Sequence, residues 1–131
     1  MPRYKYDPPY CNAEELTLKT ADEEKFIFYR SKACTIKKLW AQITEAVMCA
    51  STQSKIDVGI AGNDDAYIDA FEIPDNSLVG TMVDLTASLL LTAVSAGQML
   101  VASVNAAALE GGSEAGKCKF VIEVEVENHT T

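Results

Sequence analysis

The side chains that most often carry catalysis are sparse in this sequence. Its single histidine is His129, in a tail segment, whereas nucleophilic mechanisms of the Ser-His-Asp or Cys-His kind need a histidine that the fold holds in place. No glycine-rich phosphate-binding motif of the G-x-x-x-x-G-K-[ST] or G-x-G-x-x-G kind occurs. We therefore expect a protein that is not an enzyme and that uses no cofactor.

Four cysteines, at positions 11, 34, 49 and 118, form no C-x-x-C pair and are too scattered for a structural zinc site. Two disulfides are possible, but a chain of 131 residues with 48% hydrophobic residues can bury a core without them. We expect reduced, mostly buried thiols. The N-terminal segment lacks the apolar stretch of a secretory signal, which agrees with folding in a reducing cytoplasm.

Carboxylates are the remaining chemical resource. Asp57, Asp64, Asp65 and Asp69 lie close together in the sequence and could bind Ca²⁺ through oxygen ligands, but their spacing does not match an EF-hand. Turn formation by Asn63, Asp64 and Asp65 is the interpretation that we favour, so we expect no metal. A small hydrolase that uses paired carboxylates stays open as an alternative function.

Charge is distributed unevenly along the chain. The formal net charge is -8, which argues against a nucleic-acid binder because such binding depends on basic clusters. Residues 1–55 hold nine Lys/Arg against seven Asp/Glu, whereas residues 56–131 hold two against twelve. This asymmetry either steers the chain onto a basic partner or serves only solubility, and we favour solubility. Residues 85–109 are uncharged but too rich in Ser, Thr, Gln and Asn for a membrane span, so we expect two buried segments joined at residues 95–97.

Short segments of alternating polarity, separated by turn residues, predict strands. They cover residues 16–18, 25–30, 55–61, 67–73, 79–85 and 119–127, with turns at 62–65 and 74–76 and a loop at 111–116. Residues 35–48 are ambiguous, because their apolar side chains fit a helix, whereas an inward row of Leu39, Ala41 and Ile43 fits a strand. The neighbouring strands favour a strand. We predict one all-β domain over residues 13–131, an antiparallel β-sandwich or jelly roll.

Residues 1–12 predict an extended N-terminal arm, because Pro2, Pro8 and Pro9 remove backbone donors. Tyrosines are interleaved with these prolines and suit a binding surface, although the arm could equally fold back on its own domain. Trp40, the only tryptophan, is typical of a core or interface anchor. The candidate partner interface comprises Tyr4, Tyr6, Pro8, Pro9, Tyr10 and Trp40.

Three segments together resemble small β-sandwich virion proteins of tailed bacteriophages: IDVGIAGNDDAYIDAFEIPDNSLVGTMVDL (residues 56–85), SAGQMLVASV (95–104) and KCKFVIEVEVE (117–127). In those proteins a strand ending in Val-Gly precedes an Asp-rich turn and an Ile-Asp-Ala strand, and a Gly-containing turn leads into the last hairpin. The resemblance covers roughly residues 24–127 as a pattern of strands and turns. It does not account for the arm or for residues 35–48.

The resemblance implies a structural virion protein without catalytic or cofactor residues. Its first expectation is a capsid decoration (cement) protein, made in the host cytoplasm and bound to the major capsid protein or other virion subunits at the capsid surface. Copies would associate with one another, most simply as trimers, with residues 85–109 as the candidate subunit contact. The alternative is a tail-fibre or receptor-binding module that recognises carbohydrate through Trp40 or the Asp64–Asp65 turn. Neither nucleic acid nor membrane is an expected partner.

Overall fold

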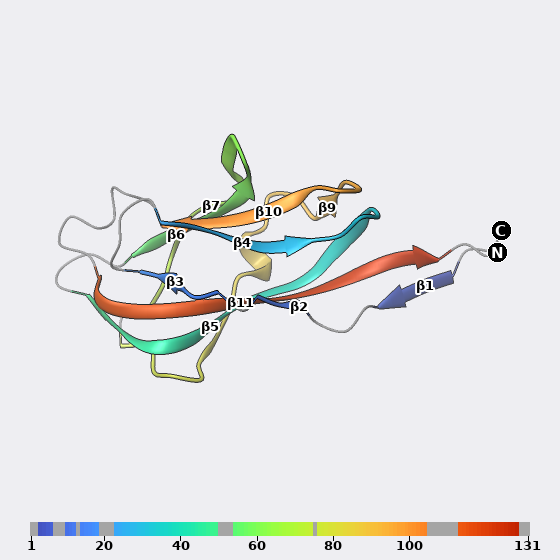
Figure 1. The fold of residues 1–131 in the computed structure, drawn as a ribbon. Helices are drawn as coiled ribbons and strands as arrows, with labels where there is room; N and C mark the ends of the chain where they lie inside the picture. Colours follow the sequence, from blue (N-terminus) through green and yellow to red (C-terminus); the bar gives the residue numbers. More distant parts are fainter. Residues whose placement is uncertain are drawn as a thin grey trace.

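The computed structural model describes residues 3–6, 10–12, 14–18, 23–49, 54–74, 76–104 and 113–128. Within these ranges the chain forms strands and a single 3-10 turn, η1 (Thr86–Ser88), so the all-β expectation is confirmed. No helix in this part of the chain is long and apolar enough to cross a membrane. The strands form two antiparallel sheets that face each other as layers (Figure 1).

The larger sheet is built around two long strands. These are β5 (Cys34–Cys49) and β11 (Ser113–Asn128), which pair with each other along most of their length. The other edge of β11 carries β1 (Arg3–Tyr6), β2 (Tyr10–Cys11) and β3 (Leu16–Thr17), and the other edge of β5 carries β8 (Met82–Asp84) and β9 (Ala93–Val94). Strand β11 is therefore the centre of this sheet.

The smaller sheet has the order β4 (Glu24–Tyr29), β10 (Met99–Val104), β6 (Lys55–Ile60) and β7 (Asn63–Glu72). Strand β10 lies between two neighbours and is buried on both faces apart from Met99. Because β4 and β7 are the edges, they carry the more polar and irregular sequences.

The core lies between the two sheets and follows from period-two alternation. Along β11 the buried side chains include Phe120 and Ile122, and each alternates with a half-buried residue that faces outward. Along β5 the inward row is Leu39, Ala41 and Ile43, as the strand interpretation of residues 35–48 predicts. The helical spacing in that segment is thus incidental, because pairing with β11 on one edge and β8 and β9 on the other satisfies its backbone as a strand.

The strand predicted at residues 79–85 is shorter in the structure, because residues 79 and 80 form a turn and β8 begins at Met82. Two further predicted boundaries are wrong. The turn placed at residues 62–65 is a shorter one at Ala61 and Gly62, where Gly62 has a φ of 86°, and β7 begins at Asn63 rather than Tyr67. The loop placed at 111–116 gives way to strand from Ser113, because β11 keeps pairing with β5 through a series of register shifts on both sides of Ala115 and Lys117. Both errors come from reading polar and glycine residues as breaks.

The segment predicted as an arm runs beside β11. Residues 3–6 pair with Glu125–Asn128, and Tyr10 and Cys11 pair with Ile122 and Val121. Because the last pair between β11 and β5 is Glu125 with Thr35, β1 and the end of β11 continue as a two-stranded ribbon beyond the sandwich, visible at one end of Figure 1. The described parts of the arm thus pair with β11 of the same chain, while the arm's role in binding a partner stays a prediction.

Candidate interaction surface

Two of the predicted interface residues, Trp40 of the sandwich and Tyr10 of the arm, lie on opposite faces of the larger sheet. Trp40 is half-buried on the outer face, where its register neighbours are Val121 on β11 and Asp84 on β8. Tyr10 is half-buried on the inner side, and its ring meets that of Phe28 edge-on at a centroid distance of 4.9 Å. The structure therefore does not join these two aromatic residues into one surface, and Tyr10 contributes to packing between the sheets.

The other predicted interface residues belong to the arm. Tyr4 and Tyr6 lie on β1, opposite Glu127 and Glu125 of β11. Pro8 and Pro9 lie outside the described residues. The two-stranded ribbon that holds Tyr4 and Tyr6 has no further strand beside it in the described part of the sheet. Among the described residues, the outer edge of β1 therefore offers backbone groups for pairing with another chain.

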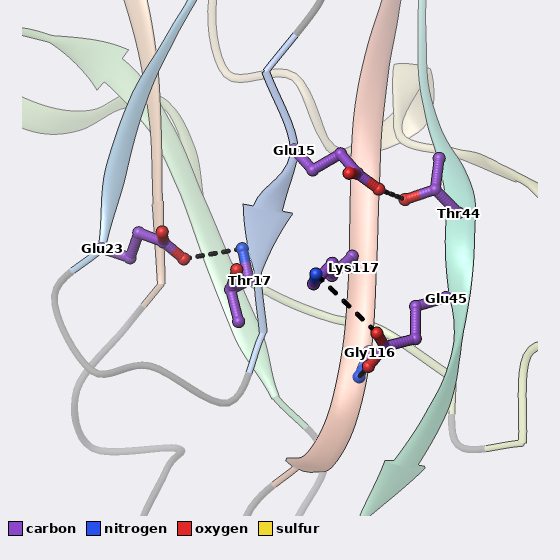
Figure 2. Close-up of polar contacts among 7 residues, drawn as sticks. All are labelled: Glu15, Thr17, Glu23, Thr44, Glu45, Gly116 and Lys117. Carbon is purple, nitrogen blue, oxygen red and sulfur yellow. Dashed lines mark hydrogen bonds and ion pairs between the residues drawn. The ribbon is translucent and has the colours of Figure 1, made fainter.

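Carboxylates bind the short strands to their neighbours (Figure 2). Glu15 accepts a hydrogen bond from the Thr44 hydroxyl, and Glu23 Oε2 accepts one from the Thr17 amide at 2.6 Å. Glu45 faces two donors of β11, the amide of Gly116 at 3.1 Å from Oε1 and the ammonium of Lys117 at 3.9 Å from Oε2.

The two contacts of Glu45 occur where β11 is irregular. Register shifts flank Lys117, and Gly116 is buried with a φ of 143°, so the strand amide is turned toward a side chain rather than a ladder partner. Each carboxylate of Figure 2 makes a contact that fixes the fold. The network positions β3 and β5 on β11.

The acidic residues singled out in the sequence meet at the β6–β7 hairpin. A single residue of β6, Gly59, stands opposite four residues of β7 (64–67), so β7 bulges over it. A Cβ added at Gly59 would lie 2.2 Å from the Asn63 carbonyl oxygen, which shows how closely the bulge covers β6. The tip of this hairpin stands out from the sheet in Figure 1. The bulge brings Asp64 and Asp65 toward the outward-facing Asp57.

Asp57 is the one buried carboxylate of the described residues, 7% exposed on the outer face of β6. Its Oδ1 accepts the amide of Ala70 at 2.7 Å, and Ala70 adopts the left-handed φ of 55°. Burial raises the pKa of Asp57, the Ala70 hydrogen bond opposes that rise, and repulsion from Asp64, Asp69 and Asp65 adds to it. A second bulge of β7 places residues 69 and 70 opposite Asp57 alone. Asp57 therefore holds this bulge in place at an electrostatic cost.

The described residues contain no group of three or more His, Cys, Asp or Glu side chains that could hold a metal ion. Among the described cysteines, Cys11 is exposed, whereas Cys34 and Cys118 are buried. Burial, with a smaller contribution from Glu15, raises the pKa of Cys118 to about 12, so this thiol stays protonated and unreactive. Trp40 and the Asp64–Asp65 pair, proposed above as alternative sugar contacts, belong to different sheets.

One continuous segment covers the edge of β5 that does not pair with β11. Residues 76–94 run beside it, from the bond between the Asn76 amide and the Val47 carbonyl to the pairing of Val94 with Cys34. The same segment reaches the smaller sheet, where the Leu90 amide donates to the Tyr67 carbonyl at 2.7 Å. The Tyr67 hydroxyl completes this closure by donating to the Ala93 carbonyl at 2.6 Å. Residues 76–94 thus close one side of the sandwich.

This segment exposes large apolar side chains. We call residues 76–92 the uncharged flank, because Asp84 is their only charged residue. Its exposed apolar side chains are Leu78 (69%), Val79 (65%), Met82 (44%), Leu90 (66%) and Leu91 (53%). A second apolar surface lies on the smaller sheet, where Phe26, Tyr29 and Met99 are exposed beside the buried Val101.

Sequence reasoning located only half of the uncharged flank. The uncharged run 85–109 includes Leu90 and Leu91, but it was expected to be mostly buried and to begin at Leu85. The sequence does contain a signal for the whole flank, because residues 76–104 include one charged residue, Asp84. Because a search for uncharged residues stops at Asp84, the predicted run began at Leu85 and left out Leu78 and Val79.

Asp84, the one charged residue of the uncharged flank, is held by a hydrogen bond from Thr86. Its Oδ1 accepts the Thr86 amide at 2.9 Å. Hydrogen bonds from Thr86 lower the pKa of Asp84, and the charge of Lys38 lowers it further. The one charge of the uncharged flank thus has a counter-charge on β5.

No protein-family model and no curated protein matches this chain. Among solved structures, it is similar to a chain of the cyanophage Pam1 capsid asymmetric unit, with a TM-score of 0.51 and 11% sequence identity. The likeness covers 98% of this chain and 85% of that chain. At this identity it shows a shared fold: the two-sheet arrangement described here also occurs in a component of a phage capsid.

Proposed function

We propose that this chain is a structural protein of a phage virion, a decoration protein that binds the outer surface of the head and acts without catalysis. The observation that supports it most directly is the fold likeness, over nearly the whole chain, to a chain of a cyanophage capsid. The resemblance of residues 56–85, 95–104 and 117–127 to phage virion proteins points the same way.

The surfaces of the molecule suit such a role. A protein that stabilises a shell must hold a rigid body against several neighbours, and the two-sheet core supplies that body. The ribbon of β1 and the end of β11 offers an open strand edge, and the outer face of the larger sheet offers Trp40 among Lys and Glu side chains. We assign shell binding to these two features and self-association, expected as trimers, to other surfaces.

The decisive experiment measures how many copies particles contain. Particles of the virus that encodes the chain are purified on a gradient, and the chain is quantified by mass spectrometry relative to the major shell protein. We expect a ratio of the same order as the number of shell subunits. A handful of copies per particle would assign the chain to the tail, and its absence from particles would overturn the proposal.

The role of the arm is tested by adding the purified protein to particles that lack it. Deletion of residues 1–6 removes β1 but keeps Tyr10 on Phe28 and the Asn12 side chain that accepts the Phe120 amide at 2.6 Å. We expect this variant to keep its melting temperature within a few degrees and to lose binding to the shells. Deletion of residues 1–12 is the less informative variant, because it removes packing contacts as well.

A further inference from the structure

We infer that the uncharged flank, residues 76–92, is the surface by which one copy of this chain binds a second copy. This deepens the proposed function by locating its self-association. The inference concerns the isolated chain, so its failure and the failure of the particle experiment are distinguishable.

The first argument is electrostatic. Each copy carries a formal net charge of -8, so two copies repel each other wherever acidic surfaces meet. The acidic β6–β7 hairpin, with Asp64, Asp65 and Asp69, makes the smaller sheet's edge the least suitable contact. On the uncharged flank the only charge is Asp84, and Lys38 contributes a favourable positive charge to it. Identical acidic chains therefore approach most closely there.

The second argument is chemical composition. The core of a protein–protein interface is depleted in charge and enriched in large apolar side chains. The flank places Leu78, Val79, Leu90 and Leu91 at exposures of 53% to 69%, although each would be more stable out of water. A basic partner would instead bind the acidic β6–β7 hairpin. A second copy of this chain is the partner whose own exposed surface is guaranteed to match in polarity.

The third argument is size. The flank follows β5 from Val47, bonded to Ser77, to Ile36, bonded to Thr92. These eleven strand steps span roughly 35 Å at about 3.3 Å per residue. At its Leu90 end the segment also bridges to Tyr67 on the smaller sheet, so there it spans two layers about 10 Å apart plus their side chains, a width of roughly 20 Å. A surface of this length and at most this width has an area of up to roughly 700 Å², which approaches the ~800 Å² per partner of a stable interface.

Sedimentation equilibrium of the full chain from about 1 to about 200 µM tests the inference. Two charged variants of the flank, Val79→Glu and Leu90→Glu, are compared with Phe26→Glu on the smaller sheet. The three side chains are matched in exposure, at 65%, 66% and 59%. We expect the wild type to associate, each flank variant to weaken the association at least about tenfold, and the Phe26 variant to stay within about twofold.

Salt dependence and hydrogen exchange provide readouts that need no variant. If identical acidic chains meet at a neutral surface, raising NaCl from about 0.05 to about 0.5 M screens their repulsion and strengthens the wild-type association. Amide exchange should slow with concentration within residues 78–92 and not in β4. A wild type that is monomeric over the whole range, protection elsewhere, or a Phe26 variant that dissociates as readily as the flank variants would overturn the inference.

Discussion

Replacing the buried carboxyl by an amide, Asp57→Asn, should stabilise the protein at neutral pH. The asparagine oxygen can still accept the Ala70 amide, which Asp57 Oδ1 now accepts at 2.7 Å. The substitution removes a charge that burial disfavours and that Asp64, Asp65 and Asp69 repel. The left-handed backbone at Ala70 thus keeps its partner while the electrostatic cost disappears.

The expected gain is modest because two effects oppose each other. A hydrogen bond to a charged acceptor contributes about 1.5–3 kcal/mol and a neutral one about 1 kcal/mol, so the variant loses part of the Ala70 bond. The pKa of Asp57 is nevertheless raised, which means that burial and repulsion outweigh this bond. We expect a net gain on the order of 1 kcal/mol at pH 7, which is a rise in melting temperature of roughly 3–6 °C.

The pH dependence follows from the sign of the shift. A carboxyl whose folded pKa lies above its unfolded value of 3.8 contributes full stability below pH 3.8 and loses it as pH rises through the folded pKa. The wild type should therefore approach the stability of the Asp57→Asn variant as the pH is lowered from 7 toward 4. Urea unfolding of both proteins at several pH values measures this difference.

Two results would contradict the reasoning about Asp57. One is an Asn variant that is less stable than the wild type at pH 7, and the other is a difference that does not change with pH. The Asp57→Ala variant is the matched control, because it removes the charge but leaves the Ala70 amide without its acceptor. We expect it to be less stable than Asp57→Asn by about 1–3 kcal/mol.

Three further predictions use the same denaturation and labelling assays. Asp84→Asn should show the opposite pH trend to Asp57→Asn. The pKa of Asp84 is lowered, so its ionised form stabilises the fold at neutral pH, and this stabilisation is lost as the pH falls below 3.8. A difference in stability between variant and wild type that stays constant down to acidic pH would contradict this. Tyr67→Phe should lose about 1–2 kcal/mol in urea unfolding, since the hydroxyl that donates to the Ala93 carbonyl is removed; a neutral effect would mean that this bond does not hold the closing segment. Alkylation at pH 8 followed by mass spectrometry should modify Cys11 and leave Cys118 intact until the protein unfolds, and rapid native labelling of Cys118 would refute its burial.

The strands that sequence predicts best are those whose two faces differ. Residues 119–127 alternate strictly because one face meets the core and the other meets water, and the structure confirms them. Residues 35–48 were ambiguous because Trp40 is an apolar residue on the outer face, where it adds an apparent helical spacing. In such a segment, the choice between helix and strand depends on the strands that pair with it.

The features that sequence did not reveal depend on contacts between distant segments. The burial of Asp57 arises from the extra residues of β7, and the strand from Ser113 persists because Glu45 takes up the turned amide of Gly116. Neither effect has a local signature, since bulges set the relation between two strands rather than the pattern within one. The sequence predicted only part of the uncharged flank. Absence of charge identifies a segment, but it does not tell whether the segment is buried or exposed.

The position of β11 in the larger sheet has a consequence for how the protein is made. β1, β2 and β3 all pair with this one strand, although more than one hundred residues separate β1 from it along the chain. During synthesis these early strands therefore leave the ribosome long before their partner exists. We expect the larger sheet to assemble only after residue 128 has emerged, in a slow step dominated by long-range contacts, with the apolar strand β5 dependent on chaperones until then.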